Sequence, residues 1–166
     1  MTKTATGIFV LPPLPNQSGR KPQKLELQAG RHFRTEKELQ MWLVDYIKQS
    51  KPSYRLRGGS YEPFPVAGKS NFSVAELDTE IKIPNGGRVD ILFKDELLVE
   101  CKLHLYISSI AQAIGQIWLY HRYFPKCRPV IAGTLSKNEK LQPSLERAVL
   151  ECGLSLWIVK TNEKGC

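Results

Sequence analysis

Residues 87–102 read GRVDILFKDELLVECK, and the other elements of the chain can be placed around this stretch. Two runs rich in Val, Ile, Leu and Phe flank the polar break Lys94–Glu96, which predicts the two strands of a hairpin. Successive side chains of a strand alternate between its faces, so Glu100 and Lys102 project from the same side. Asp90 joins them if it lies opposite Glu100, a register that requires a three-residue loop. The hairpin is therefore expected to bring two carboxylates and a lysine to one point of the sheet.

Charged groups on such an apolar hairpin are costly to bury unless they are paired or bound to a metal. Mg²⁺ prefers oxygen ligands and usually takes one or two protein carboxylates together with waters and phosphate oxygens. Asp90 and Glu100 can supply these carboxylates, and the backbone carbonyl of Cys101 is a candidate third ligand. Lys102 would then hold or help to deprotonate an attacking water and offset charge on a phosphate. The alternative is a plain ion pair near a strand end.

An aspartate followed about ten residues later by Glu-x-Lys on the next strand resembles the PD-(D/E)xK nuclease superfamily. The matching residues are Asp90 and the Glu-x-Lys of residues 100–102, with Val89 in the place of the proline in the family's name. The resemblance covers about residues 35–135. It implies a restriction-endonuclease-like αβββαβ core and a bound Mg²⁺, for which Mn²⁺ can substitute.

Residues 108–120 read SSIAQAIGQIWLY and predict a helix directly after the hairpin. The expected apolar face consists of Ile107, Ile110, Ile114, Ile117, Trp118 and His121. Gln112, Gln116 and Tyr120 form a neighbouring stripe with a spacing of four residues. Many superfamily members carry a glutamine on this helix, so the resemblance implies that Gln116 orients the lysine or contacts the scissile strand. A solvated amide flank of a core helix is the alternative.

A second helix is predicted upstream, over residues 35–47. Thr35 and Glu38 have the spacing of a capping box, which gives Glu38 a structural role. Glu36 projects within the apolar face of this helix, whereas Glu38 lies roughly opposite that face. An acidic residue of the first helix often completes the metal site in the superfamily, and Glu36 has the better angle. Favourable interaction with the helix dipole is the alternative role for Glu36.

The charge balance of the 166 residues favours a polyanionic partner. Lys and Arg outnumber Asp and Glu by 24 to 16, which gives a net charge of +8 and a pI of about 9.4. Contacts with phosphates release counterions and supply much of the nonspecific affinity for nucleic acid. DNA is favoured over RNA as this partner. The candidate nucleic-acid contacts are Arg55, Arg57, Lys82, Arg88 and Tyr120, with solvated surface positions as the alternative.

Cysteine spacing and hydropathy bear on the compartment. The cysteines at positions 101, 127, 152 and 166 have no metal-ligand spacing, which favours a reduced, cytoplasmic protein. No apolar run approaches the length of a membrane span, and the N-terminus does not have the pattern of a cleaved export signal.

The predicted organisation is an extended, proline-rich arm over residues 1–30 and a single nuclease-like domain over residues 31–166. The arm could contact a recruited partner or a second copy of the chain. Strands are expected over 75–83, 128–133 and 154–159, with a helix that Ser136 and Glu139 open as a second capping box. The fold class is therefore α/β, a mixed central sheet flanked by helices, with an extra C-terminal αβ unit after the core.

These observations favour a Mg²⁺-dependent nuclease, most simply a DNA endonuclease. Glu36, Asp90 and Glu100 would hold the metal, Lys102 would act on water and phosphate, and Gln116 would orient the lysine. Two alternatives remain open from the sequence, a catalytically idle nucleic-acid-binding subunit of the same fold and a nuclease that cleaves RNA.

Overall fold

The computed structural model describes residues 21–49, 77–84, 86–93 and 96–162, together with the backbone of two short N-terminal strands. Those two strands pair antiparallel with each other and are β1 (Thr2–Lys3) and β2 (Phe9–Val10). The other described elements are, in chain order, β3 (Lys24–Gln28), α1 (Glu36–Gln49), β4 (Leu77–Lys82), β5 (Arg88–Phe93), β6 (Leu97–Lys102), α2 (Ile107–Tyr120), β7 (Arg128–Ser136), α3 (Pro143–Glu151) and β8 (Ser155–Thr161).

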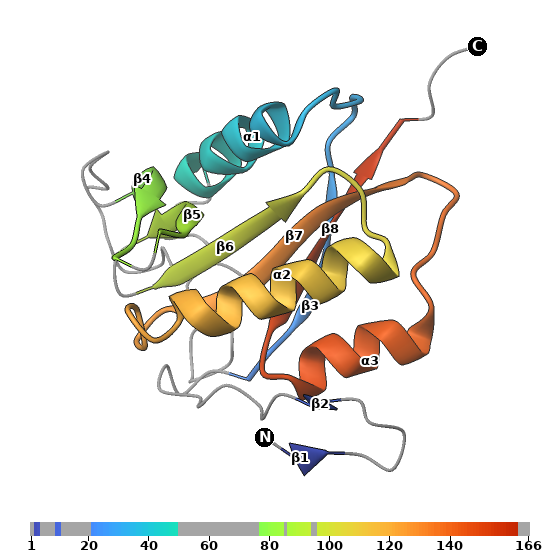
Figure 1. Cartoon of the computed structure of the whole chain (residues 1–166). Coiled ribbons are helices and arrows are strands. Elements are labelled where there is room, and N and C mark those ends of the chain that lie inside the picture. The colour runs from blue at the N-terminus through green and yellow to red at the C-terminus, as the bar shows by residue number, and fades with distance from the viewer. Residues whose placement is uncertain are drawn as a thin grey trace, which may run out of the picture.

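A six-stranded mixed sheet with the order β3-β8-β7-β6-β5-β4 forms the centre of the molecule. Strands β6, β7, β8 and β3 pair in parallel, whereas β4, β5 and β6 pair antiparallel. Helix α1 packs on one face of the sheet, and α2 and α3 pack on the other (Figure 1). The α/β class and the mixed sheet with helices on both faces are thereby confirmed. In the described part of the chain, no helix is long and apolar enough to cross a bilayer.

The β5–β6 hairpin has the predicted register. Ile91 pairs with Val99 and Phe93 pairs with Leu97, so three residues separate the ends of the two strands. Strand β6 is buried along its whole length because β5 and β7 flank it and helices cover both of its faces. Its even-numbered side chains face α2, since Leu98 belongs to the core cluster around that helix.

Strand β5 changes the direction of its side chains at Asp90. Residues two apart on a regular strand face the same side, yet Val89 packs in the cluster around α2 and α3 while Ile91 packs in the cluster around α1. On the neighbouring strand β4, Glu80 lies opposite this point with a left-handed φ of 59°. The ladder pairs on either side are regular, so the irregularity is confined to Glu80 and Asp90.

An edge strand of the sheet lies within the segment that we expected to be an arm. Strand β3 pairs in parallel with β8, from Lys24 opposite Leu156 to Gln28 opposite Lys160. The boundary that we expected between arm and domain, at residue 30, therefore falls after a strand that already belongs to the sheet. The pairing satisfies the backbone N–H and C=O groups that β8 would otherwise expose along its edge.

Helix α3 begins later than the sequence pattern predicts. Ser136 N–H donates to the Glu139 carboxylate at 3.0 Å, as in a capping box, but the segment closes into a turn. The helix starts at Pro143, because proline is tolerated at the first position of a helix. In a helix that started at residue 137, Pro143 would be an interior residue and would remove a backbone hydrogen bond. Ile107 also departs from the prediction, because it begins α2 with 66% of its surface exposed.

Candidate functional site

A buried hydrogen-bonded chain links three of the predicted site residues. Lys102 Nζ donates to Glu100 Oε1 at 3.0 Å and to Gln116 Oε1 at 2.9 Å. Glu100 and Lys102 are only 2% and 6% exposed, because both project from β6 beneath α2. Gln116 reaches them from the third turn of α2. The lysine is thus fixed between a carboxylate and an amide, as the resemblance implied for Gln116.

The second oxygen of Glu100 has no partner among the described residues. Glu100 Oε2 is buried and accepts no hydrogen bond there, although leaving a buried carboxylate oxygen unpaired is costly. Burial and the negative charge of Asp90 together raise the pKa of Glu100 to about 7, against the opposing effect of Lys102. The chemistry of this oxygen suits a cation or a hydrogen-bond donor that would complete its shell.

Asp90 is held at both its backbone and its side chain. The Cys101 N–H donates to Asp90 Oδ2 at 2.7 Å, and the side-chain amide of Gln40 donates to the Asp90 carbonyl oxygen. Burial raises the pKa of Asp90, while the Cys101 N–H and the charge of Lys102 act in the opposite direction. Gln40 is buried on α1 and was not singled out from the sequence. Its only signal there is its position one turn after Glu36.

Asp90 lines a cavity of about 540 Å³ between α1 and the β4–β5 hairpin. Glu36, Gln40, Glu80 and Cys101 also line it. Glu36 adds to the negative charge that acts on both Asp90 and Glu100, although its own side chain is exposed. The first turn of α1 therefore contributes a carboxylate to the cavity of Asp90, whereas Glu100 projects from β6 toward α2.

Glu38, in contrast, serves the start of α1. Its N–H donates to the Thr35 hydroxyl oxygen at 3.1 Å, and its carboxylate accepts a hydrogen bond from the Arg34 N–H at 2.9 Å. In a capping box this carboxylate would accept a hydrogen bond from the Thr35 N–H. It accepts one instead from the preceding residue, Arg34. The two acidic residues of this turn have different surroundings, Glu36 at the cavity and Glu38 at the cap.

Glu80 is a second cavity residue that sequence reasoning missed. Its carboxylate pairs with Arg88 Nε at 2.6 Å and with Lys37 Nζ at 3.5 Å. A non-glycine residue in the left-handed region costs on the order of 1 kcal/mol, and no sequence motif marked this position. Both cations at the cavity rim are therefore already paired with an internal carboxylate.

The expected nucleic-acid contacts divide into three groups. Lys82 and Arg88 are exposed and lie directly opposite each other on β4 and β5. Tyr120 is buried in the core at 4% exposure, because it follows Ala113 and Ile117 on the inner face of α2. Tyr120 is therefore not exposed for the nucleic-acid contact that we expected of it. Arg55 and Arg57 lie outside the described residues.

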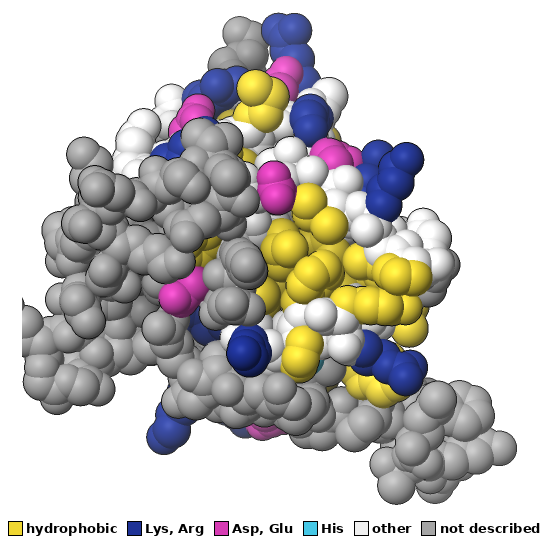
Figure 2. Space-filling model, turned by 90° about the vertical axis from the view of Figure 1, so that its left-hand side faces the viewer, with side chains coloured by type: hydrophobic (Ala, Val, Ile, Leu, Met, Phe, Trp, Pro, Cys, Tyr) yellow, Lys and Arg dark blue, Asp and Glu magenta, His cyan; other side chains and the backbone are white. Residues whose placement is uncertain are grey.

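The face of the molecule beside β4 carries charges of both signs. Figure 2 shows acidic and basic side chains around an area of hydrophobic side chains on this face. The salt bridges of Glu80 with Lys37 and Arg88 illustrate the same mixture at the level of single residues. The two cations that line the cavity, Lys37 and Arg88, thus share one of its carboxylates.

A metal at this place would have to be held by few protein groups. Within the described ranges, no group of three or more His, Cys, Asp and Glu side chains is arranged to hold a metal ion. The charge of Asp90 acts on Glu100, and the Cys101 carbonyl belongs to the residue between Glu100 and Lys102. Such a donor set fits Mg²⁺, which commonly keeps several waters and one or two carboxylates.

No family model matches this chain, and no curated protein or solved structure is significantly similar to it.

Proposed function

We propose that this protein is a divalent-metal-dependent nuclease of the PD-(D/E)xK type, with DNA as the favoured substrate. The observation that carries the proposal is the buried Glu100 carboxylate, whose Oε2 lacks a partner among the described residues beside Lys102 and Asp90. A structural ion pair accounts for Oε1 alone. A cation at Oε2 accounts for the burial of the whole carboxylate.

The element order supports the same assignment. Helix α1, strands β4, β5 and β6, helix α2 and strand β7 follow one another as αβββαβ, the order that the resemblance implies for the core. The pair α3 and β8 then follows as the extra αβ unit. On this interpretation the motif residues lie on the second and third strands of the core.

We assign Asp90, Glu100 and the Cys101 carbonyl as the metal ligands, with Glu36 as the carboxylate that completes the site from α1. Mg²⁺, or Mn²⁺ in its place, would supply Lewis-acid activation of the phosphate and of a bound water. The Cys101 N–H bond to Asp90 Oδ2 restrains the direction in which this carboxylate can point. Its other oxygen is the one that we expect to face the metal.

Lys102 acts on the reacting phosphate in this proposal. Its ammonium is held by Glu100 and Gln116, which together fix its position through two hydrogen bonds. A cation positioned in advance stabilises the charge that develops on a pentavalent phosphate without further rearrangement. Gln116 is a positioning residue, because it acts through the lysine.

The test is cleavage of supercoiled plasmid and of single-stranded RNA with Mg²⁺, Mn²⁺ or chelator. We expect metal-dependent nicking or linearisation of the plasmid, and its loss in Glu100→Gln, which keeps the shape of the side chain and removes its charge. Nucleic-acid binding without cleavage under every metal condition would instead favour an idle binding subunit. Faster cleavage of the RNA would reassign the substrate.

A further inference from the structure

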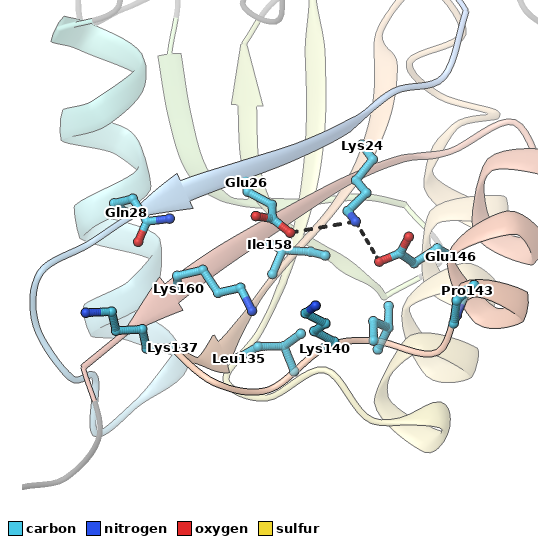
Figure 3. Close-up of a pocket in the computed structure, with 11 residues that line it drawn as sticks. Lys24, Glu26, Gln28, Leu135, Lys137, Lys140, Pro143, Glu146, Ile158 and Lys160 are labelled. Carbon is cyan, nitrogen blue, oxygen red and sulfur yellow. Dashed lines mark ion pairs between the residues drawn. The ribbon is translucent and has the colours of Figure 1, made fainter.

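A second cavity lies at the opposite edge of the sheet from the candidate site. It measures about 620 Å³ and is bounded by β3, β8, the segment between β7 and α3, and the first turn of α3 (Figure 3). Four lysines and two glutamates line it, and none of its lining residues belongs to the cavity at Asp90. The proposed nuclease activity assigns no role to it.

The positive charge of this cavity is only partly neutralised. Lys24 Nζ pairs with Glu146 at 2.8 Å and with Glu26 at 3.7 Å, so one lysine engages both carboxylates. In the described ranges, Lys137 and Lys140 have no carboxylate within ion-pair distance. The part of the cavity away from Lys24 therefore has an excess of positive charge.

Lys160 adds a buried ammonium to this part of the cavity. The residue is 9% exposed, and its Nζ donates to the carbonyl oxygens of Glu139 and Ser136, the latter at 3.5 Å. These partners are neutral, and no carboxylate of the described residues pairs with Lys160. Figure 3 shows the side chains of Lys140 and Lys160 extending into the cavity toward one another. Two like charges that face each other repel, and an anion between them would reverse that effect.

Apolar side chains complete the lining. Leu135, Leu141 and Ile158 lie beside the lysines. Small-molecule sites typically have volumes of about 300–1,000 Å³ and combine an apolar wall with a few polar groups that fix orientation. The volume and lining of this cavity therefore suit a ligand with an anionic part and an organic body, and not an inorganic ion alone.

We propose that this cavity binds the phosphate groups of a nucleotide, with Lys140 and Lys160 as their ligands and the apolar wall against the nucleoside. The nucleotide is either free or the phosphorylated end of a nucleic-acid strand, because both present the same chemistry. This proposal is independent of catalysis at Asp90 and Glu100, so that loss of one assignment leaves the other unaffected.

Isothermal titration calorimetry in the presence of chelator tests the site without metal at the carboxylates. The ligands are ATP, inorganic tripolyphosphate and a 5′-phosphorylated single-stranded oligonucleotide. We expect Lys140→Gln to weaken nucleotide binding on the order of tenfold, as for loss of one charge-assisted hydrogen bond. Lys140 is exposed, so its replacement should leave folding intact. Lys126→Gln, an exposed lysine that does not line the cavity, is the matched control and should bind like the parent.

The comparison of ligands identifies the source of the phosphate. Preference for ATP indicates a free nucleotide, and preference for the oligonucleotide indicates a strand end. Tripolyphosphate that bound as tightly as ATP would overturn the role of the apolar wall. Absence of binding at millimolar ligand, or equal affinities of Lys140→Gln and Lys126→Gln, would overturn the site.

Discussion

At the scale of single residues, Glu100 combines deep burial with a carboxylate that is only half satisfied. Its Oε1 is bound by Lys102, whereas Oε2 has no partner within the described part of the chain. Burial and the neighbouring charge of Asp90 both disfavour ionisation, and Lys102 compensates only in part. Without bound metal, the folded protein should therefore be least stable when the Glu100 carboxyl group is ionised.

The cost of ionising Glu100 predicts that the stability of the protein depends on pH. The pKa of Glu100 is raised from 4.5 to about 7, so the folded state favours the protonated form of this group. Its contribution to the stability of the fold is therefore complete below pH 4.5 and is lost as the pH rises through about 7. In chelator, Glu100→Gln should therefore gain up to about 3 kcal/mol of unfolding free energy relative to the parent between those limits. Urea unfolding at a series of pH values measures the difference. A difference that stays constant with pH would contradict the raised pKa.

Lys102 allows an enzyme to be distinguished from a binding protein. Lys102→Ala should lower turnover by about 10²–10³, as for loss of one preorganised electrostatic group, and should change DNA affinity only modestly. A binding protein would lose one phosphate contact among many and about one unit of salt dependence. Single-turnover cleavage and binding at several salt concentrations separate the two results. Cleavage at the parental rate would refute the mechanism.

At the scale of elements, the first turn of α1 separates catalysis from capping. Glu36 lines the cavity of Asp90, whereas Glu38 bonds to Thr35 and Arg34. Glu36→Gln should lower cleavage with little loss of stability. Glu38→Ala should cost about 0.5–2 kcal/mol through the cap and leave cleavage nearly intact. Paired assays of cleavage and thermal melting measure both, and the reverse outcome would move the metal ligand to Glu38.

The packing of β7 against the end of β6 depends on a glycine. A Cβ on Gly133 would lie 2.9 Å from the Lys102 carbonyl oxygen and 2.5 Å from the Leu105 side chain. Gly133→Ala should therefore destabilise the fold by about 1–3 kcal/mol through overpacking next to Lys102. Gly115→Ala on α2 is the matched control, since a Cβ there meets no atom within 4 Å. Chemical denaturation should show the control to be neutral or more stable, and equal effects would argue against the close contact.

At the scale of the whole molecule, metal binding and folding should be linked. A ligand that binds only the folded state at 100 times its dissociation constant adds about 2.7 kcal/mol of stability. Saturating Mn²⁺ should therefore raise the melting temperature by about 5–10 °C for a domain of this size. The rise should be smaller at pH 6 than at pH 8, because protons compete for Glu100. Differential scanning fluorimetry measures it, and equal melting in Mn²⁺ and chelator would contradict the metal site.

The sequence by itself determined the local features of this protein. Alternation and turn length fix the register of the β5–β6 hairpin, because a shift of one residue would exchange its two faces. Helical periodicity likewise identified α1 and α2, and the Thr35 cap followed from its spacing to Glu38. Each of these depends on residues only a few positions apart. The convergence of Glu100 and Lys102 on one face follows from the same short-range geometry.

Only the tertiary structure decided the features that depend on distant segments. Strand β3 joins the sheet because β8 offers it an open edge, which no pattern in residues 24–28 reveals. The contacts of Gln40 with Asp90 and of Gln116 with Lys102 require helices packed on opposite faces of the sheet. The raised pKa of Glu100 requires the burial that α2 and the flanking strands provide. Desolvation and long-range backbone pairing arise only when the chain is folded, so they lie beyond any local sequence pattern.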